Sequence, residues 1–311
     1  MTFGTFAEWL ADGAVAQAEA WRPDLVVYER MAPFGLLAAA VLGVPAVRHD
    51  LGIYYIHPGE LAGQLRHMAP ALQRHGVPDL VDDSPWLDIA PPSMAGAGRD
   101  GWSLRPVPYN GGGVLPDWVL RQPERPRIAV TLGTIVPRMQ GVGAVERIVA
   151  LAPEVDAEFV LAMEPRDCDK LGRLPANVRA AGWIPMNALL RTCTAVVHHG
   201  GSGTMYAALD AGVPQLLMPY GADDRHVNAS AVLDRGVGLA CAPEQIDTTL
   251  LQRLITDGSL RTTTAEVRAE LAEMPPPSAL VERLESLTAE PRATVSGRSA
   301  TDCARGAAQQ H

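Results

Sequence analysis

The segment 195–212 constrains the fold of this chain more than any other stretch. It begins with the short β-branched run Ala195-Val-Val197, continues through the turn His198-His-Gly-Gly201, and ends in helix formers that stop at Gly212. This pattern predicts a buried strand, a glycine-rich turn and a helix. A helix that starts at a tight turn presents unpaired backbone N–H groups and the positive end of its dipole, which suits a phosphate group. The alternative is a plain strand-to-helix connection in which the glycines serve only for turning.

The side chains of this turn favour the phosphate-binding interpretation. Ser202 and Thr204 supply hydroxyl groups and His199 supplies a ring donor, while Gly201 and Gly203 let the backbone approach a ligand. Two adjacent histidines and two hydroxyls exceed what turning alone requires. The first histidine, at position 198, is interpreted as a structural residue at the strand end.

The second half of the chain predicts a doubly wound parallel sheet, because strand-like runs alternate with helical patterns. The runs are residues 127–132, 158–163, 178–183, 195–198, 215–219 and 238–241. Such sheets bind ligands at the carboxyl ends of their strands. Those ends carry Thr131-Leu-Gly-Thr134, Gly182-Trp-Ile-Pro185, the glycine-rich turn and Tyr220–Arg225, so we expect all four clusters at one rim.

The first half predicts a smaller sheet of the same kind. Apolar residues Phe6, Leu10, Ala14 and Ala18 recur at four-residue spacing and predict a helix over residues 1–21. A strand at 25–28, a helix at 35–42 and a strand at 44–47 form a βαβ unit with parallel strands. Further along, the pattern predicts a helix over 61–75, a short strand before Pro92 and an edge strand over Arg105–Tyr109.

Composition excludes several classes of function. A net charge of −9 argues against a nucleic-acid or anionic-membrane partner. The four cysteines are far apart and contain no C-x-x-C pair, which is typical of reduced thiols in a cytoplasmic protein. The N-terminus has no secretory pattern, and the apolar stretch 31–47 is interrupted by prolines and too short to span a bilayer.

Together these motifs resemble the GT-B glycosyltransferases, in the natural-product branch that attaches deoxysugars to polyketide, macrolide, aromatic and enediyne aglycones. The resemblance rests on Thr131-Leu-Gly-Thr134, Gly182–Leu190, His198–Thr204 and Asp224–Ala229, in this order and spacing, and covers roughly residues 3–287. It implies an α/β fold of two Rossmann-like domains facing a cleft. The expected domains are an incomplete acceptor-binding domain at 1–109 and a nucleotide-sugar domain at 127–290. Glycines followed by prolines predict a linker at 110–126, and the polar, non-periodic composition of residues 291–311 predicts a disordered tail.

The resemblance also implies roles for individual residues at the donor site. His199 and the turn Gly201–Thr204 would hold the diphosphate, which in this branch usually belongs to thymidine diphosphate (TDP). Trp183 and the backbone of Ile184 would flank the nucleobase.

On the sugar side, the resemblance assigns Thr134 to the phosphate or sugar and Asp224 to the sugar hydroxyls. The family usually follows that aspartate with glutamine, whereas this chain has Arg225. A guanidinium cannot accept a hydrogen bond from a hydroxyl group, so we expect a changed sugar preference.

The N-terminus departs from the family pattern, because the early Gly-His that supplies the general base is not found in front of Phe3. We therefore expect either a missing N-terminal segment or a lost base. Glu29 and His49, each at a strand end, are the candidate substitutes. The alternatives are a carboxylate that caps the next helix, for Glu29, and a substrate contact or plain polar role, for His49.

The predicted function is thus an inverting glycosyltransferase that moves a deoxysugar from a TDP-sugar to a hydroxyl of a polyketide-like aglycone. The TDP-sugar is a co-substrate, and no other cofactor or metal is expected. The D-x-D string Asp167-Cys-Asp169 matches a metal-binding motif of another transferase fold, but it follows Pro165 in an expected exposed turn. A homodimer or an activator protein could be a partner. The alternative function is a nucleotide-sugar-binding protein without activity, and an epimerase of related fold is disfavoured because the motifs match transferases better.

Overall fold

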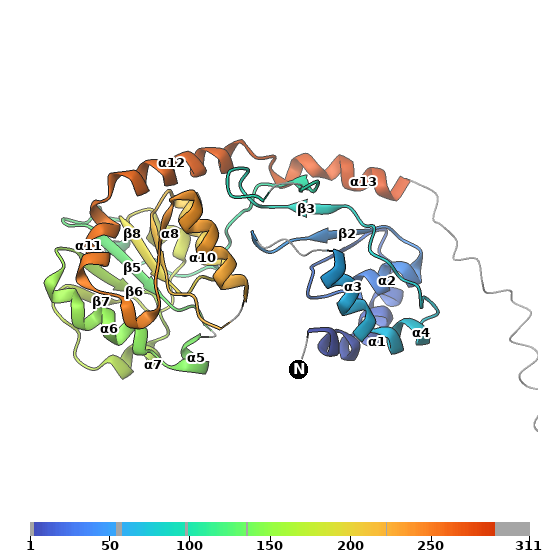
Figure 1. Cartoon of the computed structure of the whole chain (residues 1–311), viewed down its shortest axis with the longest axis horizontal. Coiled ribbons are helices and arrows are strands. Elements are labelled where there is room, and N and C mark those ends of the chain that lie inside the picture. Colours follow the sequence, from blue (N-terminus) through green and yellow to red (C-terminus); the bar gives the residue numbers. More distant parts are fainter. Residues whose placement is uncertain (1–2, 54–57, 97–98, 135, 222, 290–311) are drawn as a thin grey trace, which may run out of the picture. The chain divides into compact units, whose positions relative to one another are not determined.

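The computed structural model describes residues 3–53, 58–96, 99–134, 136–221 and 223–289 (Figure 1). Packing divides these residues into two compact units. The first unit contains residues 3–50, 58–87 and 277–289, and the second contains residues 51–53 and 88–276. The domain boundaries expected at residues 109, 126 and 290 remain predictions; packing places residues 88–109 in the second unit and 277–289 in the first.

The first unit contains the predicted βαβ motif. Helix α1 (Phe3–Trp21) precedes strand β1 (Val26–Tyr28), helix α2 (Phe34–Leu42) and strand β2 (Ala46–His49). The two strands pair in parallel, and Gly43 ends α2 in the left-handed conformation with a φ of 65°. A glycine suits this position because it has no β-carbon to clash there.

Helix α1 buries a different face from the one predicted. Ala7, Ala11 and Val15 are buried against α2, whereas Phe6 and Leu10 are 49% and 40% exposed. The prediction was wrong for Phe6 and Leu10, because the small side chains on the neighbouring face let α1 and α2 approach closely and leave the large ones outside. The buried residues follow the same four-residue spacing, one position along.

Two further predictions for the first half need correction. The helix expected over 61–75 is interrupted at Met68, because Pro70 lies in the first turn of the second piece and restricts the residues before it. The edge strand expected over Arg105–Tyr109 is absent from the described residues, since Pro106 and Pro108 have no N–H group for hydrogen bonds to a neighbouring strand.

The remaining elements of the first half are α3 (Pro58–His67), α4 (Ala69–Arg74), β3 (Trp86–Asp88) and β4 (Trp102–Ser103). The sheet order is β1-β2-β3-β4.

The second unit contains the predicted doubly wound sheet, with its strands in the order β10-β9-β8-β5-β6-β7. Every pairing in it is parallel. The strands are β5 (Arg127–Thr131), β6 (Glu158–Leu161), β7 (Val178–Ala180), β8 (Ala195–His198), β9 (Gln215–Leu217) and β10 (Gly238–Ala240). The α-helices are α5 (Val136–Gln140), α6 (Gly143–Leu151), α7 (Pro165–Cys168), α8 (Met186–Leu190), α9 (Ser202–Ala211), α10 (Asp223–Arg235), α11 (Thr248–Thr256) and α12 (Gly258–Glu273). Helix α13 (Val281–Ala289) belongs to the first unit, and the 3-10 turns are η1 (Asp117–Leu120), η2 (Ala152–Glu154), η3 (Asp169–Leu171), η4 (Pro243–Gln245) and η5 (Pro277–Leu280).

Alternate side chains of these strands enter two different cores. In β5, Ile128 and Val130 pack with α6 and α11 on one face of the sheet, whereas Ala129 packs with α8 and α9 on the other. Both faces are therefore covered by helices, as parallel sheets require. Figure 1 shows α6 and α11 beside the strands they cover.

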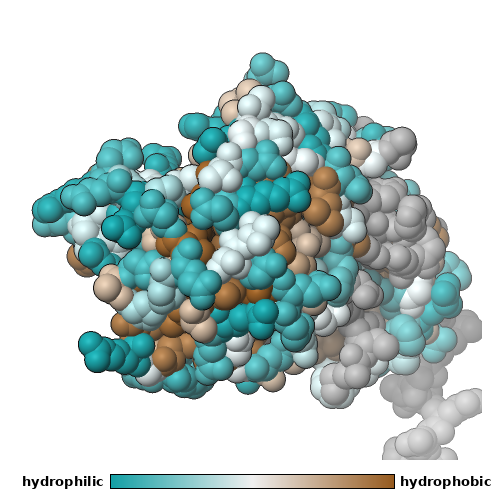
Figure 2. Space-filling model, turned by 60° about the vertical axis from the view of Figure 1, so that its left-hand side comes forward, coloured by the Kyte–Doolittle hydropathy of each residue, from teal (hydrophilic) through white to brown (hydrophobic). Residues whose placement is uncertain are grey.

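The surface mixes hydrophilic and hydrophobic residues. On the face shown in Figure 2, brown hydrophobic areas are interrupted by teal hydrophilic ones. Among the helices that the structure describes, none combines the length and hydrophobicity that a bilayer crossing would require.

Candidate functional site

The glycine-rich turn has the predicted form of strand, turn and helix. Strand β8 leads into Gly200, whose φ is 90°, and Gly201 precedes the first residue of α9 with an extended backbone. No side chain among the described residues caps this helix end. The first N–H groups of α9 are therefore available to an anionic ligand.

His198 holds the strand end, as expected for a structural residue. Its side chain is fully buried, Nε2 lies 3.0 Å from Oε1 of Gln215, and Nδ1 accepts a hydrogen bond from the Gly200 N–H at 3.2 Å. Because Nδ1 accepts, Nε2 carries the proton and donates to Gln215. Burial lowers the pKa of His198 to about 3, so its ring is neutral at physiological pH.

The His199 imidazole lies between two glycines. A β-carbon built on Gly133 would approach the ring to 2.8 Å, and one built on Gly201 would approach it to 2.6 Å. Neither position can hold a side chain without moving the ring. Nδ1 is buried and has no hydrogen-bond partner among the described residues.

The charge state of His199 follows from its surroundings. Burial and, to a smaller extent, the positive charge of Arg225 lower the pKa of His199 to about 4, although the negative charge of Asp224 opposes the shift. The ring is therefore neutral near pH 7 and offers one N–H donor. A neutral donor can hydrogen-bond a phosphate oxygen without the cost of holding a buried cation.

Asp224 and Arg225 lie in the first turn of α10, close to the glycine-rich turn. The Arg225 Nη1 donates a hydrogen bond to the backbone carbonyl of Tyr220 at 2.6 Å. The backbone of Arg225 also lies so near Gly200 that a β-carbon there would come within 3.3 Å of its carbonyl oxygen. Arg225 thus fixes the loop between β9 and α10 through one of its donors.

The sequence motif 224–229 contains one further residue of the site, to which sequence reasoning gave no role. Asn228 is fully buried, and its Nδ2 donates to the Gly200 carbonyl at 2.9 Å and to the Ser202 Oγ at 3.0 Å. Its position four residues after Asp224, on the same side of a helix, was the available signal.

The other predicted donor residues lie at the same rim but farther along it. Thr134 is exposed in the turn after β5, next to Gly133. Trp183 follows β7, two strands from β5, and is 60% exposed, whereas Ile184 is buried with α8 in the core. The structure thus packs the His199 ring against Gly133 and Gly201, and Arg225 against Gly200. It places Trp183 and Ile184 on the same edge of the sheet.

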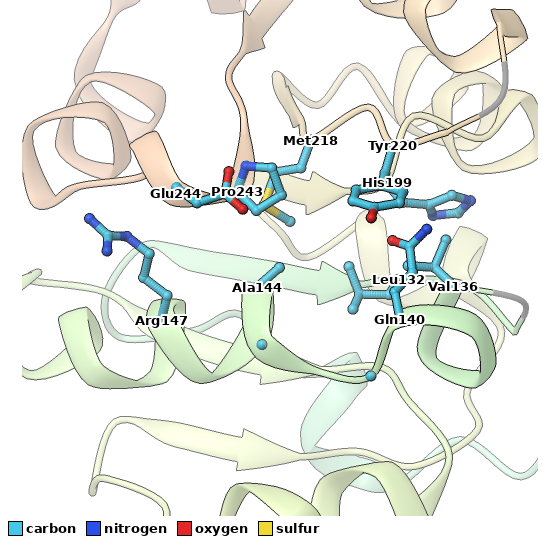
Figure 3. A pocket seen from close by; sticks show the side chains of 12 residues that line it. Leu132, Val136, Gln140, Ala144, Arg147, His199, Met218, Tyr220, Pro243 and Glu244 are labelled. Atoms are coloured by element: carbon cyan, nitrogen blue, oxygen red, sulfur yellow. The ribbon is translucent and has the colours of Figure 1, made fainter.

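A pocket of about 430 Å³ opens beside His199 (Figure 3). Its apolar wall is formed by Leu132, Val136, Ala144, Met218 and Pro243, and its polar groups come from Gln140, Arg147, Tyr220 and Glu244. Arg147 donates from Nε to the carbonyl of Ile246 at 2.7 Å. Sequence reasoning missed this pocket, because its walls come from helix α6 and turn η4, about a hundred residues apart.

The two candidate bases lie in the first unit and differ in their hydrogen bonds. The Glu29 Oε2 accepts a bond from the Met31 N–H at 2.9 Å. It does not cap the next helix as the alternative supposed, because the N-cap of α2 is Pro33 and no side-chain bond caps that helix among the described residues. The His49 Nδ1 donates to the backbone carbonyl of Asp50 at 2.7 Å. Since a carbonyl only accepts, Nδ1 carries the proton, and the Nε2 lone pair is left to take one.

The D-x-D string does not lie in an exposed turn as expected. Asp167 is buried, and it accepts a hydrogen bond from the Lys170 Nζ at 2.6 Å. A short helix, α7, forms here because Pro165 occupies its first turn. Within the described residues, no three His, Cys, Asp or Glu side chains are grouped so that they could hold a metal ion.

Comparison with known proteins identifies relatives along most of the chain. The family described as erythromycin biosynthesis protein CIII-like matches with its N-terminal domain at residues 1–133 and its C-terminal domain at residues 146–287. The elloramycin glycosyltransferase ElmGT of Streptomyces olivaceus is 41% identical over 280 residues, which cover 89% of this chain and 72% of the relative. The tylactone mycaminosyltransferase of Streptomyces fradiae is 36% identical over 310 residues, which cover 89% of this chain and 68% of the relative. Because the N-terminal domain of the family matches from residue 1, the comparison gives no support to the expected loss of an N-terminal segment.

Solved structures show the same fold. The glycosyltransferase SnogD from Streptomyces nogalater superimposes with a TM-score of 0.82 at 41% identity, over 92% of this chain and 80% of SnogD. The glycosyltransferase VinC, solved in complex with dTDP, gives a TM-score of 0.77 at 29% identity, over 92% of this chain and 78% of VinC. The fold is therefore that of two Rossmann-like domains with parallel sheets.

Proposed function

The chain belongs to the family of erythromycin biosynthesis protein CIII-like glycosyltransferases, and on that premise we propose the reaction that it catalyses. It transfers a deoxysugar from TDP to a hydroxyl group of a polyketide-like aglycone, with inversion at the anomeric carbon. The observation that supports this most is the neutral His199 imidazole beside the uncapped start of α9. A neutral N–H donor and a helix terminus together suit a diphosphate leaving group.

In this proposal the donor lies along the rim of the second unit. The diphosphate contacts His199 and the turn Gly201–Thr204, where Ser202 and Thr204 add hydroxyl donors. VinC was solved with dTDP and the rhamnosyltransferase SpnG with thymidine diphosphate, which supports TDP as the nucleotide here. Trp183 and the Ile184 backbone flank the nucleobase at the β7 end of the rim.

The sugar lies toward β9, at the other end of the rim. Asp224 accepts hydrogen bonds from the sugar hydroxyls, and Thr134 contacts the phosphate or the sugar. Arg225 uses one donor on the Tyr220 carbonyl. In this position it supplies positive charge but no acceptor for a hydroxyl, so we propose that it changes the range of accepted sugars.

The transfer is a single displacement. The acceptor oxygen attacks the anomeric carbon on the face opposite the diphosphate, the bond from that carbon to the diphosphate oxygen breaks, and a base takes the hydroxyl proton. The negative charge that develops on the diphosphate is stabilised by the donors at the start of α9. We propose His49 as the base rather than Glu29, because the hydrogen bond from Nδ1 to Asp50 leaves the Nε2 lone pair available.

The test is turnover of TDP-deoxysugars with a panel of polyketide-like aglycones, followed as glycoside formation and TDP release. The His49→Ala variant should lose about a hundredfold or more in kcat and still bind TDP, since general base catalysis typically contributes 10²–10⁴-fold. The matched Glu29→Gln variant should keep its turnover. An anomeric configuration retained in the product would contradict inversion.

A second outcome distinguishes the alternative function. If the wild-type chain binds TDP-sugars but no aglycone is glycosylated, the chain is a nucleotide-sugar-binding protein rather than a transferase of these acceptors. If it binds no TDP, the donor site is assigned wrongly.

A further inference from the structure

We propose that Asn228 is a positioning residue that orients the Ser202 hydroxyl toward the phosphate of the donor. This inference rests on the proposed function, because it concerns the same diphosphate site. It gives a role to a residue of α10 whose side chain donates hydrogen bonds to the glycine-rich turn.

The hydrogen bonds of Asn228 fix the direction of its amide. The Gly200 carbonyl can only accept, so the atom that lies 2.9 Å from it is Nδ2. The other hydrogen of Nδ2 then points to the Ser202 Oγ at 3.0 Å. Both donors of the amide are used on the glycine-rich turn.

This arrangement determines what Ser202 can do. A hydroxyl group has one donor, and an oxygen that accepts a bond from Asn228 cannot also donate along that line. The Ser202 O–H has no acceptor among the described residues, so its proton is left for a ligand oxygen. A hydroxyl that accepts one hydrogen bond also becomes a stronger donor in the next, because hydrogen bonds in a chain polarise one another.

A purely structural role explains Asn228 less well. The side chain is fully buried, and its Oδ1 has no hydrogen-bond partner among the described residues. A leucine would avoid this unsatisfied oxygen, but it would leave the Gly200 carbonyl and the Ser202 Oγ without the bonds that Asn228 donates. The polar side chain is accounted for by the two bonds it donates to the turn.

The experiment compares affinities for TDP and for thymidine, which has no phosphate, by calorimetry on the full chain. Asn228→Ala should weaken TDP binding about tenfold and leave thymidine binding unchanged. Asn177→Ala is the matched control, because Asn177 likewise donates two hydrogen bonds from Nδ2, in its case to two backbone carbonyls at 2.7 and 3.0 Å, and it comes before β7 rather than in the glycine-rich turn or α10. It should lower the melting temperature without changing either affinity. Asn228→Ser, a milder change, provides a second variant if Asn228→Ala fails to fold.

A double-mutant comparison tests whether Asn228 acts on TDP binding through Ser202. The losses of TDP affinity from Asn228→Ala and Ser202→Ala should overlap. The double variant should bind TDP no more than twofold worse than whichever single variant binds it less tightly. Losses from Asn228→Ala and Thr204→Ala should multiply, because no hydrogen bond joins those two side chains among the described residues. Equal losses for TDP and thymidine, or multiplying losses with Ser202→Ala, would overturn the proposal. Absence of TDP binding by the wild type would overturn the proposed function and this inference together, whereas wild-type binding with an unaffected Asn228→Ala would overturn this inference alone.

Discussion

At the scale of single residues, the donor site depends on the close packing of two glycines against the His199 imidazole. Gly133 and Gly201 contact it from two segments that are far apart in the chain. Gly133 has a φ of 67° and needs glycine for its backbone as well, whereas the N-cap Gly201 has a φ of −66° that any residue can adopt. The glycine at position 201 is therefore required by the ring and not by the backbone.

We predict that Gly201→Ala displaces the imidazole and weakens TDP binding by about 1.5–3 kcal/mol, the contribution of a hydrogen bond to a charged group. The added β-carbon would lie 2.6 Å from Nε2 and 3.0 Å from Cε1 of His199. Calorimetric titration with TDP measures the loss. Gly258→Ala, at the start of α12 with nothing within 4 Å of its added β-carbon, is the control and should bind normally. Unchanged affinity in Gly201→Ala would remove His199 from the phosphate site.

The two histidines of the turn also predict how stability depends on pH. Burial lowers the pKa of His198 to about 3 and that of His199 to about 4, whereas an unfolded histidine has a pKa of about 6.5. The unfolded chain therefore binds more protons as the pH falls below about 6.5. The stabilisation is fully present above that value and is lost on acidification toward pH 4.

Urea titrations between pH 7 and pH 5 should show this loss. For the fully buried His198 we expect the free energy of unfolding to fall by about 1.4 kcal/mol per pH unit below its unfolded pKa. His199→Ala should have a shallower dependence than the wild type. A free energy of unfolding that stays constant from pH 7 to pH 5 would show that these rings take up protons over the same pH range in the folded and the unfolded chain.

At the scale of elements, helix α1 shows how a sequence pattern can give the right helix and the wrong face. Its inner face consists of Ala7, Ala11 and Val15, which pack with Leu37 and Ala38 of α2. Its outer face carries Phe6, Trp9 and Trp21, which are 49%, 66% and 76% exposed. The homodimer or activator partner expected from the sequence stays a prediction.

We expect Ala11→Leu to destabilise the first unit by about 1–3 kcal/mol, because a larger side chain would force α1 away from α2. Leu10→Ala is the matched change on the exposed face and should alter the free energy of unfolding by about 0.5 kcal/mol or less. Chemical denaturation followed by circular dichroism measures both. The reverse order of the two effects would mean that α1 packs through Phe6 and Leu10, as its sequence first suggested.

At the scale of the whole molecule, the two units contain separate hydrophobic cores. Residues of α1, α2 and α4 form one, while the strands β5–β10 share theirs with α6, α8, α9 and α11. The proposed TDP site lies within the second unit. A ligand that binds one folded unit stabilises that unit through mass action.

Differential scanning calorimetry should accordingly resolve two transitions, of which TDP shifts one. At a TDP concentration a hundred times its Kd, the second unit should gain about 2.7 kcal/mol. The transition of the first unit, which Ala11→Leu lowers, should not respond to TDP. A single transition that moves as a whole with TDP would show that the two units unfold cooperatively.

The sequence by itself determined the features that depend on neighbours along the chain. Strand, turn and helix at 195–212, the alternation of strands and helices, and the parallel sheet all follow from local propensity and periodicity. The clusters at the carboxyl rim follow as well, because parallel strands bring their carboxyl ends to the same edge.

Tertiary structure alone decided what depends on contacts between distant segments. No periodicity marks Asn228 as the partner of Ser202, or Arg225 as the partner of the Tyr220 carbonyl. The wall of the pocket beside His199 and the buried face of α1 were decided in the same way. The physical reason is that packing rewards complementary shape and satisfied hydrogen bonds between side chains, and these exist only once the chain has brought the segments together.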